Sequence, residues 1–178
     1  MSTATTPNTI VEVLMREFED LFREHAGLVF GTACEVTGNR EDGEDVVQTV
    51  FLRLLRRGLP PAFQKNSRAY LYRAAINESL NIIRSRRRHP TETLEEADVP
   101  AKSSEKASHE IIHHKLYEAI AELHPVAAEA VILRYVHGYS DAEIATLLGK
   151  SRVTIAVRLH RARARLAKLL RASLAEEL

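Results

Sequence analysis

Apolar side chains recur at helical spacing along most of residues 10–88. From residue 10 to residue 26 they lie three or four positions apart, as one face of an α-helix requires, in the set Val11, Leu14, Phe18, Leu21 and Phe22. Gly27 interrupts this run, so the pattern predicts a break there and a second helix over residues 28–36. Similar apolar stripes predict a helix over residues 42–57 and another over residues 68–88.

Residues 90–108 have a different character from the rest of the chain. They contain two prolines and many small or charged residues, and their sizeable apolar side chains are Leu94 and Val99. This composition is typical of a flexible linker, because too little apolar surface is present to form a core. Residues 1–9, rich in Ser, Thr and Pro, predict a disordered tail.

Helical periodicity returns after the linker. It begins at Ile111 and continues to Leu166, with turn signals between the predicted helices. The whole pattern predicts an all-α fold of two small helical domains joined by a flexible linker. The domains are expected over residues 10–89 and 109–174.

Composition narrows the class of protein. The chain is 45% hydrophobic and 28% charged, which suffices for a core, and its apolar runs are shorter than a membrane span requires. The N-terminus lacks the basic and apolar regions of a secretory signal. A single cysteine, Cys34, excludes a disulfide framework. We therefore expect a cytoplasmic protein without membrane insertion.

The net charge of +1 conceals four blocks of opposite sign. Residues 1–48 hold 3 basic and 10 acidic side chains, and residues 49–89 hold 10 and 1. Residues 90–149 hold 4 and 11, and residues 150–178 hold 8 and 2. Two separate basic blocks predict two contacts with a polyanion, and the acidic blocks leave surfaces for another partner.

The C-terminal basic block is preceded by the cap and turn residues that are typical of a helix-turn-helix. Ser140 and Glu143 have the spacing of a capping box, Gly149 supplies a turn, and Ser151 can cap the next helix. The sides of that helix away from its apolar stripe are basic: Arg152, Arg158, His160, Arg161, Arg163, Arg165 and Lys168. A basic second helix of this kind is typical of DNA binding in the major groove.

Positions along this basic helix predict different contacts. Arg152, Thr154 and Arg158 lie near its start, where side chains reach base edges or flanking phosphates. Arg163, Arg165 and Lys168 lie further on and are expected to contact the DNA backbone or another subunit. A solvated basic helix in an antiparallel bundle would also explain the arginines, but not the succession of cap, glycine and cap.

These residues resemble those of the extracytoplasmic-function sigma factors of bacterial RNA polymerase. Residues 139–163 resemble the promoter-binding domain four of that family, through Glu143-Ile144-Ala145, Leu148-Gly149, Thr154-Ile155 and Arg158-Leu159-His160-Arg161-Ala162-Arg163. Residues 44–52 resemble the domain-two helix that binds the polymerase clamp. Residues 68–88 resemble the domain-two segment that recognises and melts the −10 element.

The resemblance implies a non-enzymatic protein without a cofactor, in which domain two covers residues 10–89 and domain four covers residues 109–174. Its implied partners are the clamp and flap regions of core RNA polymerase, promoter DNA and an anti-sigma factor. The implied polymerase contacts are Asp45, Gln48 and Phe51. The implied −10 contacts are Arg68, Tyr70, Asn77, Arg84, Arg86, Arg87 and Arg88. The implied −35 contacts are Ser151, Arg152, Thr154, Arg158, His160 and Arg161.

The chain departs from the family pattern at positions that bear on promoter sequence. Tyr70 stands where the family usually has Trp, and Val153 and Val157 stand where Gly and Ser are common. Valine at these positions offers apolar contact only, for example with the methyl group of thymine.

A different motif competes with this interpretation. His109, Glu110 and His113 match H-E-x-x-H, in which two histidines on one helix face bind zinc beside a general base. The motif lies at the edge of the linker and lacks an evident third ligand, for which Glu129 or His124 could be proposed. A zinc hydrolase is therefore a remote alternative, and we expect no metal site.

A second alternative is a helix-turn-helix regulator that binds DNA by itself. It accounts for the C-terminal basic block but leaves residues 42–88 unexplained. Binding to core polymerase distinguishes the two possibilities.

Overall fold

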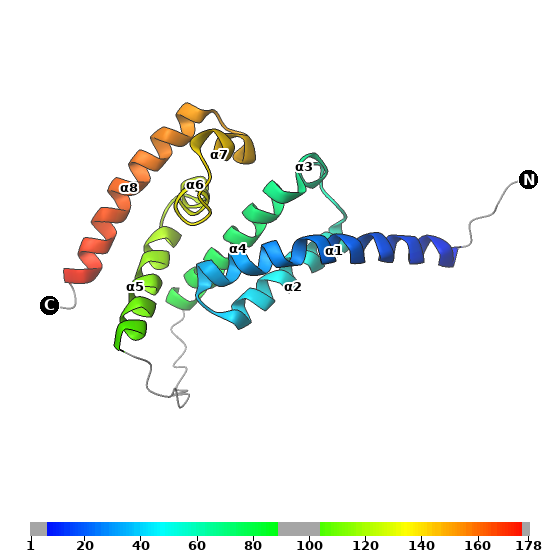
Figure 1. Cartoon of the computed structure of the whole chain (residues 1–178), viewed down its shortest axis with the longest axis horizontal. Coiled ribbons are helices and arrows are strands. Elements are labelled where there is room, and N and C mark those ends of the chain that lie inside the picture. The colour runs from blue at the N-terminus through cyan, green and yellow to red at the C-terminus, as the bar shows by residue number, and fades with distance from the viewer. Residues whose placement is uncertain (1–6, 89–103, 176–178) are drawn as a thin grey trace, which may run out of the picture.

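The computed structural model describes residues 7–88 and 104–175, and within these ranges every regular element is an α-helix (Figure 1). This confirms the all-α fold. The first half contains α1 (Pro7–Thr37), α2 (Arg40–Arg57), α3 (Pro61–Lys65) and α4 (Ser67–Arg88). The second half contains α5 (Ser104–Ala121), α6 (Pro125–Tyr135), α7 (Asp141–Leu148) and α8 (Arg152–Ala175).

The expected bounds of the tail and of the linker were wrong. Helix α1 begins at Pro7, so the last residues of the predicted tail are helical, and residues 1–6 lie outside the described part. Helix α5 begins at Ser104, inside the segment predicted as a linker, whose residues 90–103 are likewise not described. The five-residue helix α3 was not predicted, because Pro60 and Pro61 indicate only a turn. Pro60 precedes the helix, Pro61 is its first residue, and Phe63 is buried.

The predicted break at Gly27 was also wrong, since α1 continues through this residue. Glycine in a helix interior costs only about 1 kcal/mol relative to alanine. On either side of Gly27, Phe18 and Leu21 pack partly, and Val29 and Ala33 fully, into the same core. Contacts along both segments therefore outweigh the local penalty.

Helices α1 and α2 lie close together because of one glycine. A Cβ atom added at Gly43 would lie 2.4 Å from the Cys34 sulfur. Helix α2 itself begins two residues earlier than expected, where the Asn39 side chain accepts a 2.7 Å hydrogen bond from the Glu41 backbone N–H. Burial raises the pKa of the Cys34 thiol, consistent with a packing role for this residue.

The core of the first half lies between α1, α2 and α4. Its buried members are Val29, Ala33, Val46, Val50, Phe51, Leu54, Leu71 and Ala75, together with Phe63 of α3. The Phe51 ring makes edge contacts with Phe18 and Phe22, at centroid distances of 6.3 and 4.8 Å. Phe51, expected at the polymerase surface, is 3% exposed and belongs to this core.

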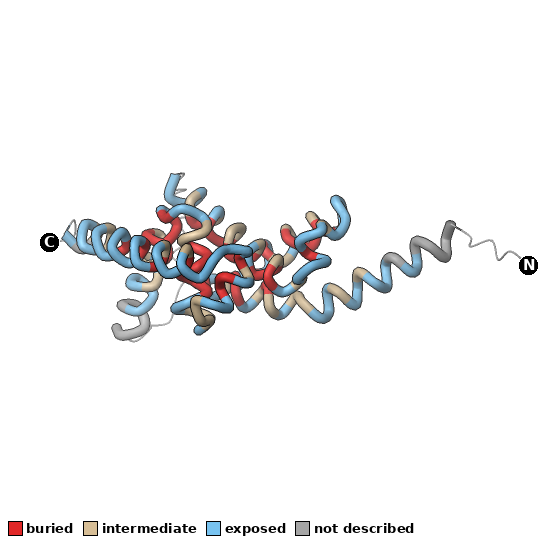
Figure 2. Tube along the Cα trace, turned by 90° about the horizontal axis from the view of Figure 1, so that it is seen from above, coloured by how far each residue is buried: buried red, intermediate tan, exposed pale blue. Residues whose placement is uncertain are grey.

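The second core is shared between the two halves. It joins apolar side chains of α5, α6, α7 and α8 to Tyr72, Ile76, Leu80 and Ile83 of α4. Figure 1 shows α4 between α1 and α2 on one side and α5 and α6 on the other. Buried residues are concentrated in this region, whereas the N-terminal turns of α1 extend away from it (Figure 2). Helix α4 is therefore the element through which the two halves pack together.

Within residues 7–88 and 104–175, no helix combines the length and the apolar character needed to cross a bilayer.

Candidate nucleic-acid and protein interfaces

The predicted helix-turn-helix is formed by α7 and α8, and each helix is capped as expected. Ser140 Oγ accepts a hydrogen bond from the Glu143 N–H at 3.3 Å, and the Glu143 carboxylate accepts one from the Ser140 N–H at 2.8 Å. The hydrogen bonds from Ser140 lower the pKa of Glu143. Gly149 ends α7 with φ 61°, in the left-handed region that favours glycine. Ser151 then begins α8 by accepting a 3.1 Å hydrogen bond from the Thr154 N–H.

Helix α8 presents one apolar face inward and a basic face outward. Ile155, Leu159, Ala162 and Leu166 are buried against the other helices of the second half. Of the predicted −35 contacts, four are exposed and two are half-buried: Ser151, Arg152, His160 and Arg161 are exposed, and Thr154 and Arg158 are half-buried. The hydroxyls of Ser151 and Thr154 lie 2.8 Å apart and bond to each other. These two side chains therefore shape the start of the helix.

A recess of about 500 Å³ lies between α8 and residues 123–127, which join α5 to α6 and begin α6. Val153 and Val157, which are 73% and 42% exposed, line it together with Arg158, Arg161 and Arg165. Arg158 Nε is covered by protein atoms and has no hydrogen-bond partner among the described residues. The recess thus combines apolar surface with guanidinium groups, the combination that contacts thymine methyls and phosphates in a major groove.

The predicted −10 contacts on α4 lie in three different environments. Tyr70 is half-buried, with its ring edge-on to Phe63 at 5.7 Å. The Arg68 guanidinium lies 5.6 Å from the ring centroid of Tyr72. Both residues belong to the first turn of α4, where Tyr70 packs against α3 and Arg68 donates a 3.4 Å hydrogen bond to the Tyr72 hydroxyl.

Further along α4, the predicted −10 contacts bind groups of the second half. Asn77 Nδ2 donates a 2.7 Å hydrogen bond to Glu129, and Arg84 Nε donates one of 2.8 Å to the Ala121 carbonyl. Arg87 forms an ion pair with Glu122. Burial, and secondarily Arg88, lower the pKa of Arg84. The sequence pattern did not indicate these contacts.

Arg86 is held within the first half. Its guanidinium forms two hydrogen bonds of 2.6 Å with the carboxylate of Asp42, which is 5% exposed. This bidentate pair joins the end of α4 to the first turn of α2. Arg88 is exposed and donates to the Arg84 carbonyl at 3.3 Å.

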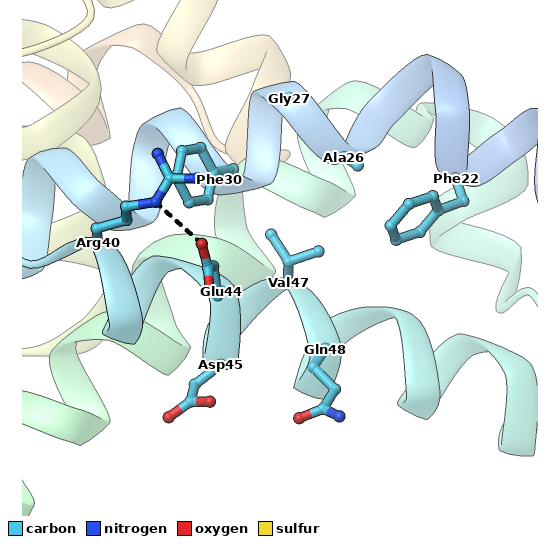
Figure 3. Close-up of a pocket in the computed structure, with 9 residues that line it drawn as sticks. All are labelled: Phe22, Ala26, Gly27, Phe30, Arg40, Glu44, Asp45, Val47 and Gln48. Atoms are coloured by element: carbon cyan, nitrogen blue, oxygen red, sulfur yellow. Dashed lines mark hydrogen bonds and ion pairs between the residues drawn. The ribbon is translucent and has the colours of Figure 1, made fainter.

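A groove of about 730 Å³ lies between α1 and α2, at the predicted polymerase contacts. Phe22, Ala26, Phe30 and Val47 supply apolar surface, and the charged or polar lining residues are Arg40, Glu44, Asp45 and Gln48. Figure 3 shows Asp45 and Gln48 on the same side of α2, pointing away from α1, whereas Val47 points toward α1. Arg40 pairs with Glu44 at 3.1 Å and lies over the Phe30 ring.

The H-E-x-x-H motif is not arranged as a zinc site. His113 Nε2 lies 2.8 Å from the Glu35 backbone oxygen, and because a carbonyl only accepts, this nitrogen carries the proton. The suggested third ligand, Glu129, is bound by Asn77 and by Arg73. In the part of the chain that the structure describes, no three His, Cys, Asp or Glu side chains gather as a metal site requires.

Glu129 is the residue of this region whose role sequence reasoning missed. It is the single charged side chain in the apolar run of residues 126–133. A carboxylate in such a run indicates a buried charge with a dedicated partner. The sequence therefore indicated a buried carboxylate, but the spacing of residues could not identify Arg73 and Asn77 as its partners.

Comparison with known proteins places both halves in one family. The Sigma-70 region 2 model matches residues 21–89, and the Sigma-70, region 4 model matches residues 113–166. The chain is 32% identical over 173 residues to the ECF RNA polymerase sigma factor SigE of Mycolicibacterium smegmatis, covering 92% of this chain and 65% of that protein.

Two further relatives agree with this. The chain is 32% identical over 157 residues to the RNA polymerase sigma factor CarQ of Myxococcus xanthus, covering 86% of this chain and 88% of that protein. A solved structure of CnrH in complex with the cytosolic domain of CnrY is similar, with a TM-score of 0.51 and 26% identity over 89% of this chain and 90% of that one.

Proposed function

Since this chain belongs to the extracytoplasmic-function sigma factors of bacterial RNA polymerase, we propose that it binds core polymerase and directs promoter-specific initiation of transcription. One observation carries the proposal: a single chain combines a capped helix-turn-helix, whose second helix is basic and exposed, with a second basic helix, α4. Such surfaces bind DNA through its phosphates and base edges. This role is one of binding, and it requires neither a catalytic residue nor a cofactor.

Helix α8 is the element proposed to bind the −35 region. Arg152 and Arg158 lie in its first two turns, where a recognition helix meets base edges. His160 and Arg161 are exposed beside the recess and are suited to phosphate contacts. Ser151 and Thr154 define the start of the helix through their mutual hydrogen bond, so we assign them to positioning it on the DNA backbone.

Helix α4 is the element proposed to bind the −10 region. Arg68 and Tyr70 lie at its start, where an aromatic ring can stack on an unpaired base, an interaction of about 1–3 kcal/mol. Asn77 supplies an amide suited to a base edge. Arg84, Arg87 and Arg88 supply positive charge for phosphates, whereas Arg86 already forms its bidentate pair with Asp42.

The groove between α1 and α2 is proposed to bind the polymerase clamp. Asp45 and Gln48 are exposed on one side of α2, and an acidic surface there complements a basic partner helix. The buried Phe51 acts indirectly, by holding α2 in place. A binding surface in the second half for the polymerase flap, and an anti-sigma factor that blocks these surfaces, belong to the same proposal, as does action in the cytoplasm.

Run-off transcription tests the function directly. Purified protein and core polymerase are incubated with a library of genomic fragments, including one that carries the protein's own gene. We expect transcripts from defined start sites that core polymerase alone does not produce. Absence of any such transcript, together with absence of binding to core polymerase in a pull-down, would contradict the proposal.

A further inference from the structure

We propose that Val153 and Val157 of α8 recognise two thymines of the −35 element through the methyl groups of these bases. The assignment deepens the proposed function and rests on it, because it takes α8 as the −35-binding helix. It specifies which bases this chain selects, and the contact itself can be measured on DNA without polymerase.

The two valines form an exposed apolar patch near the start of α8. Val153 is 73% exposed and Val157 is 42% exposed. They lie about one helical turn apart, and the exposed Ala156 lies next to them in the sequence. Neither valine belongs to the apolar stripe that packs into the core. Because valine is also a poorer helix former than alanine, neither burial nor helix propensity explains its presence at these two positions.

Positive charge surrounds this patch. Arg158, Arg161 and Arg165 line the same recess, and the described residues that line it include no Asp or Glu. In the major groove of DNA, phosphates flank the base edges, so apolar surface framed by guanidinium groups is complementary to it. Charge complementarity therefore favours DNA over an uncharged protein surface as the partner of these valines.

The chemistry of valine selects one base. Among the four bases, thymine alone presents a methyl group in the major groove. A valine side chain neither donates nor accepts a hydrogen bond. A polar base edge placed against it would therefore lose water without gaining a partner. Contact with the thymine methyl group and the cost of covering a polar edge both favour thymine.

The spacing of the valines restricts where the two thymines can lie. Val153 and Val157 are four positions apart, which corresponds to about 6 Å along a helix axis. Successive bases of a DNA strand are separated by about 3.4 Å. The two methyl groups should therefore belong to base pairs that lie one or two steps apart, on the same strand or on opposite strands.

Replacement of thymine by uracil tests the methyl contacts. Duplexes that the full chain selects from a random pool are resynthesised with uracil at one thymine at a time. Each replacement removes a single methyl group and keeps every hydrogen-bonding group of the base. We expect about a fourfold loss of affinity at two thymines with the spacing given above. Selected duplexes without such a pair of thymines, absence of any enriched sequence, or equal affinity for all uracil duplexes would overturn the proposal.

Valine variants then assign each methyl group to its contact. Val157→Ala should reduce the uracil effect at one of the two thymines to below about twofold, and Val153→Ala should do so at the other thymine. Alanine favours the helix, so both variants should remain folded. Val157→Ile retains an apolar, β-branched side chain and should keep both uracil effects. Val13→Ala, at an exposed position of α1, is the control and should also keep both. Identical uracil effects in wild type and in the two α8 alanine variants would overturn the proposal.

Run-off transcription separates this assignment from the sigma function. A failed run-off assay together with a positive uracil test would contradict the sigma function alone. Specific transcripts without any uracil effect would contradict recognition by the two valines alone.

Discussion

At the scale of single residues, the arginines of this protein differ by what already binds them. Arg86 is held by a buried carboxylate, and Arg84 and Arg87 bind groups of the second half. Arg152 and Arg161 are exposed on α8. Identical side chains within a basic block therefore differ in their surroundings: some are paired within one half, some bind the other half, and some are exposed on the helix proposed to bind DNA. Local sequence does not distinguish these cases.

Two variants of α8 separate contacts with base edges from contacts with phosphates. Arg158 lies in the second turn of α8 beside the exposed valines, so Arg158→Ala should cost about 1–3 kcal/mol on the preferred −35 duplex and reduce discrimination against altered sites. Lys168 is exposed much further along, so Lys168→Ala should weaken all sequences alike and lower the salt slope by about one unit. Binding of the full chain to matched and scrambled duplexes across a salt series measures both. If Arg158→Ala lowers the affinity for both duplexes equally, Arg158 contacts a phosphate and not a base edge.

The polymerase contact is tested by a pair of α2 variants. Asp45→Lys reverses an exposed charge at the groove and should weaken binding to core polymerase while changing stability by no more than about 1 kcal/mol. Phe51→Ala empties a buried position and should destabilise the fold by about 3–5 kcal/mol. Thermal unfolding and a polymerase binding assay separate the two effects. Unchanged polymerase affinity of Asp45→Lys would remove this side chain from the interface.

At the scale of elements, caps and glycines set the ends of several helices. The effect of each glycine depends on the residues that pack around it. Gly149 ends α7 in a left-handed conformation, as its position predicted. Gly27, the expected break, is continuous helix. Gly43 permits the close approach of α1 and α2. The same residue type thus ends one helix, is tolerated in another and is required for packing in a third.

Two glycine substitutions should therefore have opposite effects. Gly27→Ala adds a Cβ with no atom within 4 Å and should stabilise the protein by about 1 kcal/mol, because alanine favours the helix. Gly43→Ala adds one 2.4 Å from the Cys34 sulfur and should destabilise it. Denaturant unfolding of the two variants gives the comparison. A stabilising Gly43→Ala would show that α1 and α2 can separate without cost.

At the scale of the whole molecule, the two halves share a core through α4. His137 lies within this interface, its ring against Tyr72, and its Nε2 is buried without a hydrogen-bond partner among the described residues. Burial lowers the pKa of His137 from 6.5, and the Glu35 carboxylate of α1 opposes this shift. Protonation of His137 is thus more favourable in the unfolded state than in the folded one.

Stability should therefore depend on pH through His137. Because the pKa of His137 is lower in the folded state, acidification below about pH 6.5 protonates the unfolded state first, and this contribution to stability is lost as the pH falls. Between about pH 7.5 and pH 5.5 the loss of thermal stability should be smaller in His137→Phe than in wild type. His160→Gln, at an exposed position, is the control and should follow wild type. An equal pH dependence in His137→Phe would contradict this account.

The sequence by itself determined the all-α fold, the C-terminal ends of α2 and α4 and the helix-turn-helix, because these depend on apolar periodicity and on caps formed between residues three or four apart. It also indicated the basic helices proposed to bind DNA. Only the tertiary structure decided that Phe51 is buried, that Arg86 pairs with Asp42 and that Asn77 binds Glu129. These pairs lie 44 and 52 positions apart, so their formation depends on how α4 packs against both halves, which no local pattern encodes.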